Sequence, residues 1–263
     1  MKTGRYILGI ATGFFLLPGR VVHADTPAVT NAPAIDRPVS SEDFSIRTAD
    51  GKCTITINST RAPGLKEWAE QKLAPVLAEW YPKIVAMLPS DGYTAPAHFS
   101  IILKPMDGVA YTSGNKVVAN STWLETEIGH EAIGSLVHET VHVVQQFGNH
   151  DRQNPGWLVE GSADYIRWFK YEPQSHGADV VWLRTFHPPS LHYNDSYRIT
   201  ANFLNWVTEN YDADIVGQLN AAMRDGKYDD GLWEKFTGKT ATELGEEWEK
   251  EIEAQLNNAG ASR

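Results

Sequence analysis

Cysteine is nearly absent from this 263-residue sequence, which contains only Cys53. A single cysteine cannot form an intrachain disulfide, so the fold has to be stabilised by its apolar core. A composition of 42% hydrophobic and 11% aromatic residues is sufficient for such a core. The alternating segment KCTITIN is typical of a strand, so we interpret Cys53 as a half-buried structural residue and not as a catalytic thiol.

Basic residues are also scarce in the sequence. The chain has 23 lysine and arginine residues against 33 aspartate and glutamate residues, which gives a formal net charge of −10. A protein with this charge is repelled by the phosphates of nucleic acids and by anionic lipid surfaces. We therefore expect neither nucleic acid nor a membrane as a partner.

Apolar runs long enough to cross a membrane are missing as well. The run Tyr6–Leu17 has about a dozen residues and is interrupted by glycine, whereas a spanning helix needs about 20. Lys2 and Arg5 precede this run, and small residues lead up to Ala24, as in a secretory signal. The sequence predicts a signal peptide over residues 1–24 and a secreted protein, extracellular or periplasmic. Removal of this segment takes away three basic residues and leaves 20 basic against 33 acidic side chains.

The remaining sequence predicts a short leader and one domain. Residues 25–42 are rich in proline and small polar residues, which indicates a flexible leader. Residues 43–258 are expected to form an α+β domain, with an N-terminal mixed sheet followed by a mainly helical C-terminal half. Strands are predicted at 44–58 around a tight turn, at 97–105, and in a hairpin over 108–124 that turns at 114–115. Helices are predicted at 64–88, 131–147, 155–170, 197–210, 213–224 and 240–257.

The segment HETVHVVQQ, residues 138–146, carries the strongest chemical signal. Residues four apart lie on one face of a helix, so the imidazoles of His138 and His142 can converge on one ion at about 2.0 to 2.1 Å. Glu139 lies next to the first histidine, in the position of a general base. The pattern predicts a catalytic zinc site with one Zn²⁺ per chain.

A zinc site of this kind needs a third protein ligand and keeps its fourth position for water. The segment PGWLVEGSADYIRW supplies Glu160 and, four residues later on the same helical face, Asp164. We assign Glu160 to the metal and Asp164 to the outer ring N–H of a ligand histidine. The spacing alone leaves the reverse assignment open. Gln145 returns to the face of His138 and is within reach of the site.

Peptide hydrolysis by such a site also needs a donor for the oxyanion and a place for the substrate. Tyr197, at the start of a predicted helix, is the first choice for the donor, followed by Tyr193 and His192. A peptide can bind as an added strand along an exposed sheet edge. The segment Lys116, Val117, Val118 and Ala119 is expected to be that edge, although its apolar character fits an interior strand equally well.

Several segments together resemble the basic secretory protein family, a group of secreted zinc-dependent peptidases in plants, fungi and bacteria. The segments are GVAYTSGNKVVANSTWL, HETVHVVQQ, GWLVEGSADYIRW, SYRITANFLNWV and LNAAMRDGKYDDGLWEKFTGKTATEL, and the likeness runs from about residue 44 to 256. The third segment is also similar to the third-ligand helix of gluzincin metallopeptidases. The resemblance implies a zincin-like metallopeptidase fold, with His138, His142 and Glu160 as zinc ligands and Glu139 as the catalytic glutamate. The chain departs from the family name, because it is acidic.

We predict from these features a secreted zinc endopeptidase that acts on a protein or peptide substrate as a monomer. An exopeptidase or glycopeptidase remains an alternative, because the sequence marks no group that would capture a substrate terminus or a sugar. A non-catalytic protein that binds peptide or glycan on the same fold is a further alternative. A general base beside an open metal position argues against it, since a structural zinc site has no need of one.

Overall fold

The computed structural model describes residues 43–148, 153–186, 191–195 and 197–260. The predicted signal peptide and flexible leader lie outside the described residues. No helix in the described segments is both long and apolar enough to cross a membrane.

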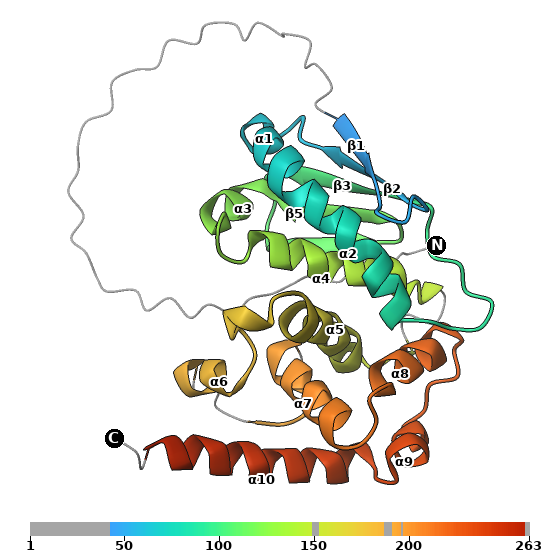
Figure 1. The fold of residues 1–263 in the computed structure, drawn as a ribbon, viewed down its shortest axis with the longest axis vertical. Helices are drawn as coiled ribbons and strands as arrows, with labels where there is room; N and C mark the ends of the chain where they lie inside the picture. Colours follow the sequence, from blue (N-terminus) through green and yellow to red (C-terminus); the bar gives the residue numbers. More distant parts are fainter. Residues whose placement is uncertain (1–42, 149–152, 187–190, 196, 261–263) are drawn as a thin grey trace, which may run out of the picture.

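A five-stranded mixed sheet forms the first part of the domain (Figure 1). The strands are β1 (Asp43–Arg47), β2 (Thr54–Asn58), β3 (His98–Lys104), β4 (Ala110–Ser113) and β5 (Lys116–Asn120). Their order in the sheet is β1-β2-β3-β5-β4. The three central strands are parallel, and β1 and β4 pair with them in antiparallel fashion. The predicted α+β domain with a mixed sheet is therefore confirmed.

The sheet order corrects one prediction. The segment Lys116–Asn120 pairs with β3 on one side and with β4 on the other, so it is an interior strand. Its hydrophobic residues Val117, Val118 and Ala119 are buried, as the apolar pattern required. The described edge beside it is β4. The assignment of Lys116, Val117, Val118 and Ala119 to a substrate-binding edge was wrong, because the parallel crossover from β3 places the second strand of the hairpin next to β3.

Two helical segments pack on the sheet and carry its core. The first runs from 63 to 87 through η1 (Pro63–Leu65), α1 (Lys66–Trp68), the π-helical η2 (Ala69–Leu73) and α2 (Ala74–Met87). The second is α4 (Ala132–Gln145), which lies beside α2 and against β4 and β5 (Figure 1). Alternate residues of β2, such as Ile55 and Ile57, are fully buried, because one face of the sheet is covered by these helices.

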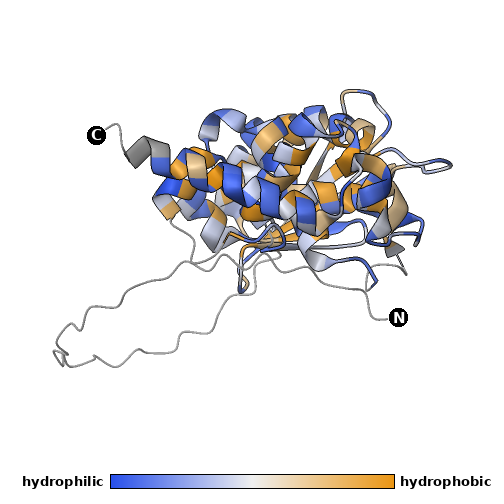
Figure 2. Cartoon of the chain, turned by 90° about the horizontal axis from the view of Figure 1, so that it is seen from below, coloured by the Kyte–Doolittle hydropathy of each residue, from blue (hydrophilic) through white to orange (hydrophobic). Residues whose placement is uncertain are grey.

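The C-terminal half consists of helices packed below the sheet layer (Figure 1). Figure 2, which views the molecule from below, shows hydrophilic and hydrophobic residues alternating along α10, the helix that ends near the C-terminus. Its buried residues Leu244, Trp248 and Ile252 recur every four positions, as one face of a helix requires. The elements are α5 (Gly156–Tyr165), η4 (Ile166–Tyr171), η5 (Pro173–Ser175), α6 (Val180–Phe186), α7 (Tyr197–Asn210), α8 (Ile215–Arg224), α9 (Gly231–Thr237) and α10 (Ala241–Gly260).

Three short helices were not predicted from the sequence: α3 (Ser121–Glu127), α6 and α9. Each has seven residues, which is too short for a clear helical period. The strand pattern over 108–124 continues past the true end of β5, because Asn120 begins a helix there. Its side-chain oxygen accepts from the backbone N–H of Thr122 at 3.1 Å and of Trp123 at 3.4 Å.

Candidate metal centre

Helix α4 brings the histidine motif into the interior between the sheet and the helical half. His138 and Glu139 are at most 1% exposed and His142 is 6% exposed. The helix ends at Gln146, whose φ of 48° is in the left-handed region. Arg224 holds this end, donating from Nε to the carbonyl of Gln145 at 3.0 Å and from Nη2 to that of Val144 at 3.1 Å. A cation at the carbonyl end of a helix satisfies its last acceptors and complements its dipole.

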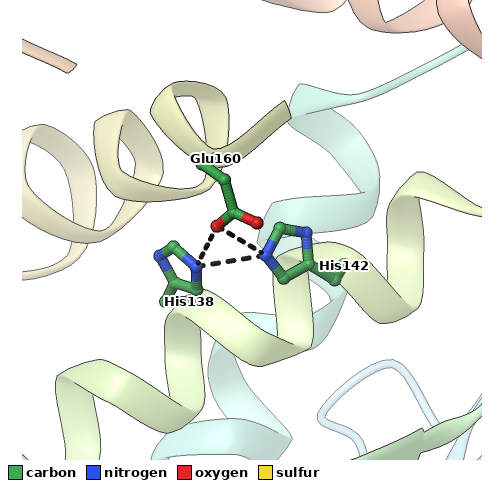
Figure 3. A group of neighbouring side chains, drawn as sticks. All are labelled: His138, His142 and Glu160. Atoms are coloured by element: carbon green, nitrogen blue, oxygen red, sulfur yellow. Dashed lines mark hydrogen bonds and ion pairs between the residues drawn. The ribbon is translucent and has the colours of Figure 1, made fainter. Parts of the chain in front are cut away.

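Three ligand atoms converge between α4 and α5 (Figure 3). The Nε2 atoms of His138 and His142 are 3.1 Å apart. Oε2 of Glu160 lies 3.2 Å from the first and 3.4 Å from the second. Ligands at about 2.0 to 2.1 Å in a tetrahedral zinc site are separated by about 3.3 Å from one another. The triangle therefore has the size of one face of a zinc tetrahedron.

The other ring nitrogens show which tautomer each histidine adopts. Nδ1 of His138 lies 2.7 Å from Oδ1 of Asp164, and Nδ1 of His142 lies 2.7 Å from Oε1 of Gln145. The amide nitrogen of Gln145 donates to the carbonyl of Val159 at 3.3 Å, so its oxygen is free to accept. Both Nδ1 atoms therefore donate, and in the neutral form of each ring the lone pair is on Nε2, directed at the triangle. Three converging lone pairs need a cation among them, and two imidazoles with a carboxylate are a zinc donor set.

The carboxylates and the histidines of the site shift the pKa values of one another so that a positive charge among them is favoured. Burial alone would lower the pKa of His138, but the carboxylates of Asp164 and Glu160 outweigh burial and raise that pKa to about 10. Burial alone would raise the pKa of Glu160, but His142 and His138 lower it to about 2. Without an ion, an extra proton on His138 supplies the positive charge. A metal ion held by His138, His142 and Glu160 would take the place of that proton, since both would use the same lone pair.

Glu139 lies beside the triangle and is held from the sheet. Its Oε2 accepts a hydrogen bond of 2.6 Å from Oγ1 of Thr112, a residue of β4. Burial raises the pKa of Glu139, against the opposite effects of the neighbouring histidines and Thr112. Sequence reasoning missed Thr112. Only its inward position on a strand that contacts α4 identifies it, and that position follows from the strand order.

The structure separates the three candidate oxyanion donors. Tyr197 begins α7 with a φ of 48°, and its ring centroid lies 6.3 Å from that of His138. Tyr193 packs its ring edge-on against Trp157, with centroids 5.3 Å apart. His192 is exposed, with its Nδ1 3.2 Å from a carboxylate oxygen of Glu249 on α10. Of the three, Tyr197 contacts a residue of the triangle, His138.

The two acidic residues that the sequence offered for the third ligand position both contact His138. Glu160 and Asp164 both lie on α5 and both reach His138, one at Nε2 and the other at Nδ1. Asp164 thus faces the ring nitrogen that points away from the triangle, and the carboxylate of the triangle is that of Glu160. Gln145 holds the second histidine in the same way, a contact for which the sequence offered only its position on the helix face.

Comparison with known proteins gives one family and two remote structural likenesses. A family described as "Peptidase of plants and bacteria" matches residues 54–248. No curated protein matches the chain. The fold is similar to two crystal structures. One is of a two-domain M1 zinc metallopeptidase mutant with bound L-tryptophan, at 14% sequence identity. The other is of an M1 zinc metallopeptidase mutant from Deinococcus radiodurans with a Tyr-Ser-Ala substrate, at 15% sequence identity. Each alignment has a TM-score of 0.49 and covers 79% of this chain and 51% of the other, so the chain spans about half the length of these proteins.

Proposed function

The chain belongs to the family of peptidases of plants and bacteria, and on that premise we propose that it is a secreted, zinc-dependent endopeptidase with a zincin-like fold. The observation that carries the zinc proposal is the buried triangle of two imidazole lone pairs and one carboxylate oxygen, with Glu139 next to it in sequence. A structural zinc site has four protein ligands, whereas this cluster offers three among the described residues, which is the number that a catalytic site with a bound water has.

His138, His142 and Glu160 would hold the ion. Zinc bound there supplies a Lewis acid and a water whose pKa is lowered to about 7. Asp164 and Gln145 fix the ring orientations of the two histidines, so that both Nε2 atoms stay directed at the same point.

Glu139 acts as the general base in this proposal. Its carboxylate takes a proton from the attacking water and passes it to the leaving amine. The burial of Glu139 suits this role, because a raised pKa brings a carboxylate closer to the pH at which it must both accept and release a proton. The hydroxyl of Tyr197 donates to the oxygen that becomes negatively charged in the transition state.

The substrate binds as an added strand along β4. The backbone N–H of Asn120, in β5, donates to the backbone carbonyl of Val109 at 2.8 Å, just before β4 begins. Backbone groups alternate along a strand, so those of Ala110 and Thr112 point away from β5. Within the described residues β4 is the last strand of the sheet, so these groups lie on the side of β4 where no further strand pairs. An edge binds a peptide through its backbone at any point along its length, which favours an endopeptidase over an exopeptidase.

Metal content and peptide hydrolysis test this function together. Purified protein should contain about one zinc per chain, hydrolyse casein, lose that activity with a chelator and regain it with zinc. Glu139→Gln should keep the zinc and lose nearly all turnover, because it removes the base and leaves the ligands. A zinc-loaded wild-type protein that cleaves no peptide bond would leave a binding protein as the better account. Absence of metal after zinc-replete purification would remove the metal site as well.

A further inference from the structure

Thr112 connects the general base to the edge of the sheet. Its Oγ1 lies 2.6 Å from Oε2 of Glu139 and 3.0 Å from the backbone oxygen of the same residue. A threonine hydroxyl has one hydrogen to donate, and the shorter distance together with the greater charge selects the carboxylate. Thr112 is 4% exposed and Glu139 is 1% exposed, so the contact is shielded from water.

We propose that Thr112 is a positioning residue for Glu139, and that it fixes the general base relative to a peptide strand bound on β4. The proposal rests on the proposed function. Thr112 donates to one carboxylate oxygen and leaves the other to accept the proton of the attacking water. A short hydrogen bond to an ionised group in a buried place is stronger than one between neutral groups, so it holds the carboxylate in one rotamer.

The position of Thr112 on its strand links the base to the substrate. Its side chain points to α4, while its backbone N–H and C=O lie on the side of β4 that faces away from β5. A peptide that pairs with β4 would bond to the backbone of the same residue whose hydroxyl holds Glu139. The base and the substrate strand are then located by one residue, which limits the error in their separation. Misplacement by about 1 Å can cost about 10²-fold in rate.

Isosteric replacement separates this role from packing. Thr112→Val keeps the shape and the β-branch but removes the hydroxyl, and Thr112→Ser keeps the hydroxyl. Thr140→Val is the matched control, since Thr140 is a buried residue of α4 whose hydroxyl donates only to the carbonyl of Leu136, at 2.7 Å. Each valine variant loses one buried hydrogen bond, and only the first is expected to affect the base.

We expect kcat of Thr112→Val to fall by about 10- to 10²-fold with KM and zinc content unchanged, because the ligands and the strand edge are intact. Thr112→Ser should stay within about threefold of wild type, and Thr140→Val within about twofold. A Thr112→Val enzyme with wild-type kcat would overturn the proposal, as would an equal loss of kcat in Thr140→Val. If Thr112→Val does not fold, Thr112→Ala gives the same comparison with Thr112→Ser.

Crystal structures of metal-free wild type and Thr112→Val provide a measurement that does not depend on turnover. The carboxylate of Glu139 should leave its position in the variant, because nothing in the new side chain can donate to it. A Glu139 carboxylate that keeps its position in the variant would contradict the inference, whatever the turnover of the variant. If zinc-loaded wild type cleaves no peptide, the proposed function fails, and the displacement of Glu139 still decides whether Thr112 holds it.

Discussion

At the scale of single residues, the two acidic side chains of α5 have different contacts and should have different effects on zinc. Glu160 supplies an atom of the triangle, whereas Asp164 contacts only the outer nitrogen of His138. Removal of a ligand destroys the site, and removal of an outer partner typically weakens metal affinity by about 10- to 100-fold.

We predict that Glu160→Ala abolishes zinc binding and that Asp164→Asn retains zinc with an affinity about 10- to 100-fold lower. Elemental analysis and competition with a chromogenic chelator measure the two effects. Zinc retained in Glu160→Ala and lost completely in Asp164→Asn would exchange the roles of the two residues.

Tyr197 is the second residue whose role can be measured directly. Its φ of 48° is uncommon for an aromatic residue, and such strained positions are frequent at functional sites. Tyr197→Phe should lower kcat by about 10²- to 10³-fold with zinc content unchanged, because the hydroxyl that we propose as the oxyanion donor is lost. Steady-state kinetics on a peptide substrate provides the test, and a rate within twofold of wild type would assign Tyr197 to packing.

At the scale of helices and strands, the position of Glu160 depends on how closely α5 packs against α7. A Cβ atom on Gly161 would lie 2.1 Å from Cγ2 of Thr200, so only glycine permits this approach. Gly156, at the start of the same helix, has no such neighbour within 4 Å. Gly161, the residue after Glu160, therefore sets the distance between the two helices.

Gly161→Ala should destabilise the protein by about 1 to 3 kcal/mol, as overpacking of a core does. It should also lower zinc affinity, because α5 must shift away from α7 and take Glu160 with it. Chemical denaturation and zinc titration measure the two effects, with Gly156→Ala as the control. Equal stability of the two alanine variants would show that the helices can separate without cost.

At the scale of the whole molecule, a partly buried charge cluster joins α4 to the C-terminal half. Glu131, which precedes α4, accepts from Arg167 of η4 at 3.1 Å and from Arg198 of α7 at 2.7 Å. Arg167 is 2% exposed and also donates to Glu172 at 2.7 Å. The cluster therefore fixes the start of α4 relative to the helices that carry Glu160 and Tyr197.

The two glutamates of this cluster should respond to pH with opposite signs. Burial opposes the ionisation of Glu131, but Arg167 and Arg198 outweigh it and lower its pKa, whereas burial raises the pKa of Glu172 despite Arg167. The stabilisation from Glu131 is present above its ordinary pKa and is lost as the pH falls through its folded-state value. The stabilisation linked to Glu172 is present at low pH and is lost as the pH rises through its folded-state value.

Glu131→Gln should therefore cost about 1.5 to 3 kcal/mol at neutral pH, with a deficit relative to wild type that shrinks on acidification. Glu172→Gln should show a deficit that grows as the pH falls through the acid range. Urea denaturation at several pH values between about 3 and 7 measures both. If the stability deficits of the two variants changed with pH in the same direction, the opposite pKa shifts of Glu131 and Glu172 would be contradicted.

The local features of this protein follow from its sequence. The convergence of His138 and His142 needs only the geometry of one helix, and the pairing of Glu160 with Asp164 on one face needs only that of another. The alternation of β2 and the stripe of α10 likewise predict which residues are buried. Such patterns are readable because side-chain direction repeats every two residues along a strand and about every 3.6 residues along a helix.

The tertiary structure alone decided what depends on distant segments. The parallel crossover from β3 made β5 an interior strand and left β4 at the edge, an order that the sequence of the hairpin does not encode. The same order brought Thr112 to Glu139, 27 positions away along the chain. Which carboxylate of α5 faces the inner nitrogens, and which tyrosine lies beside His138, were likewise decided by helix packing, because those contacts join residues that no local period relates.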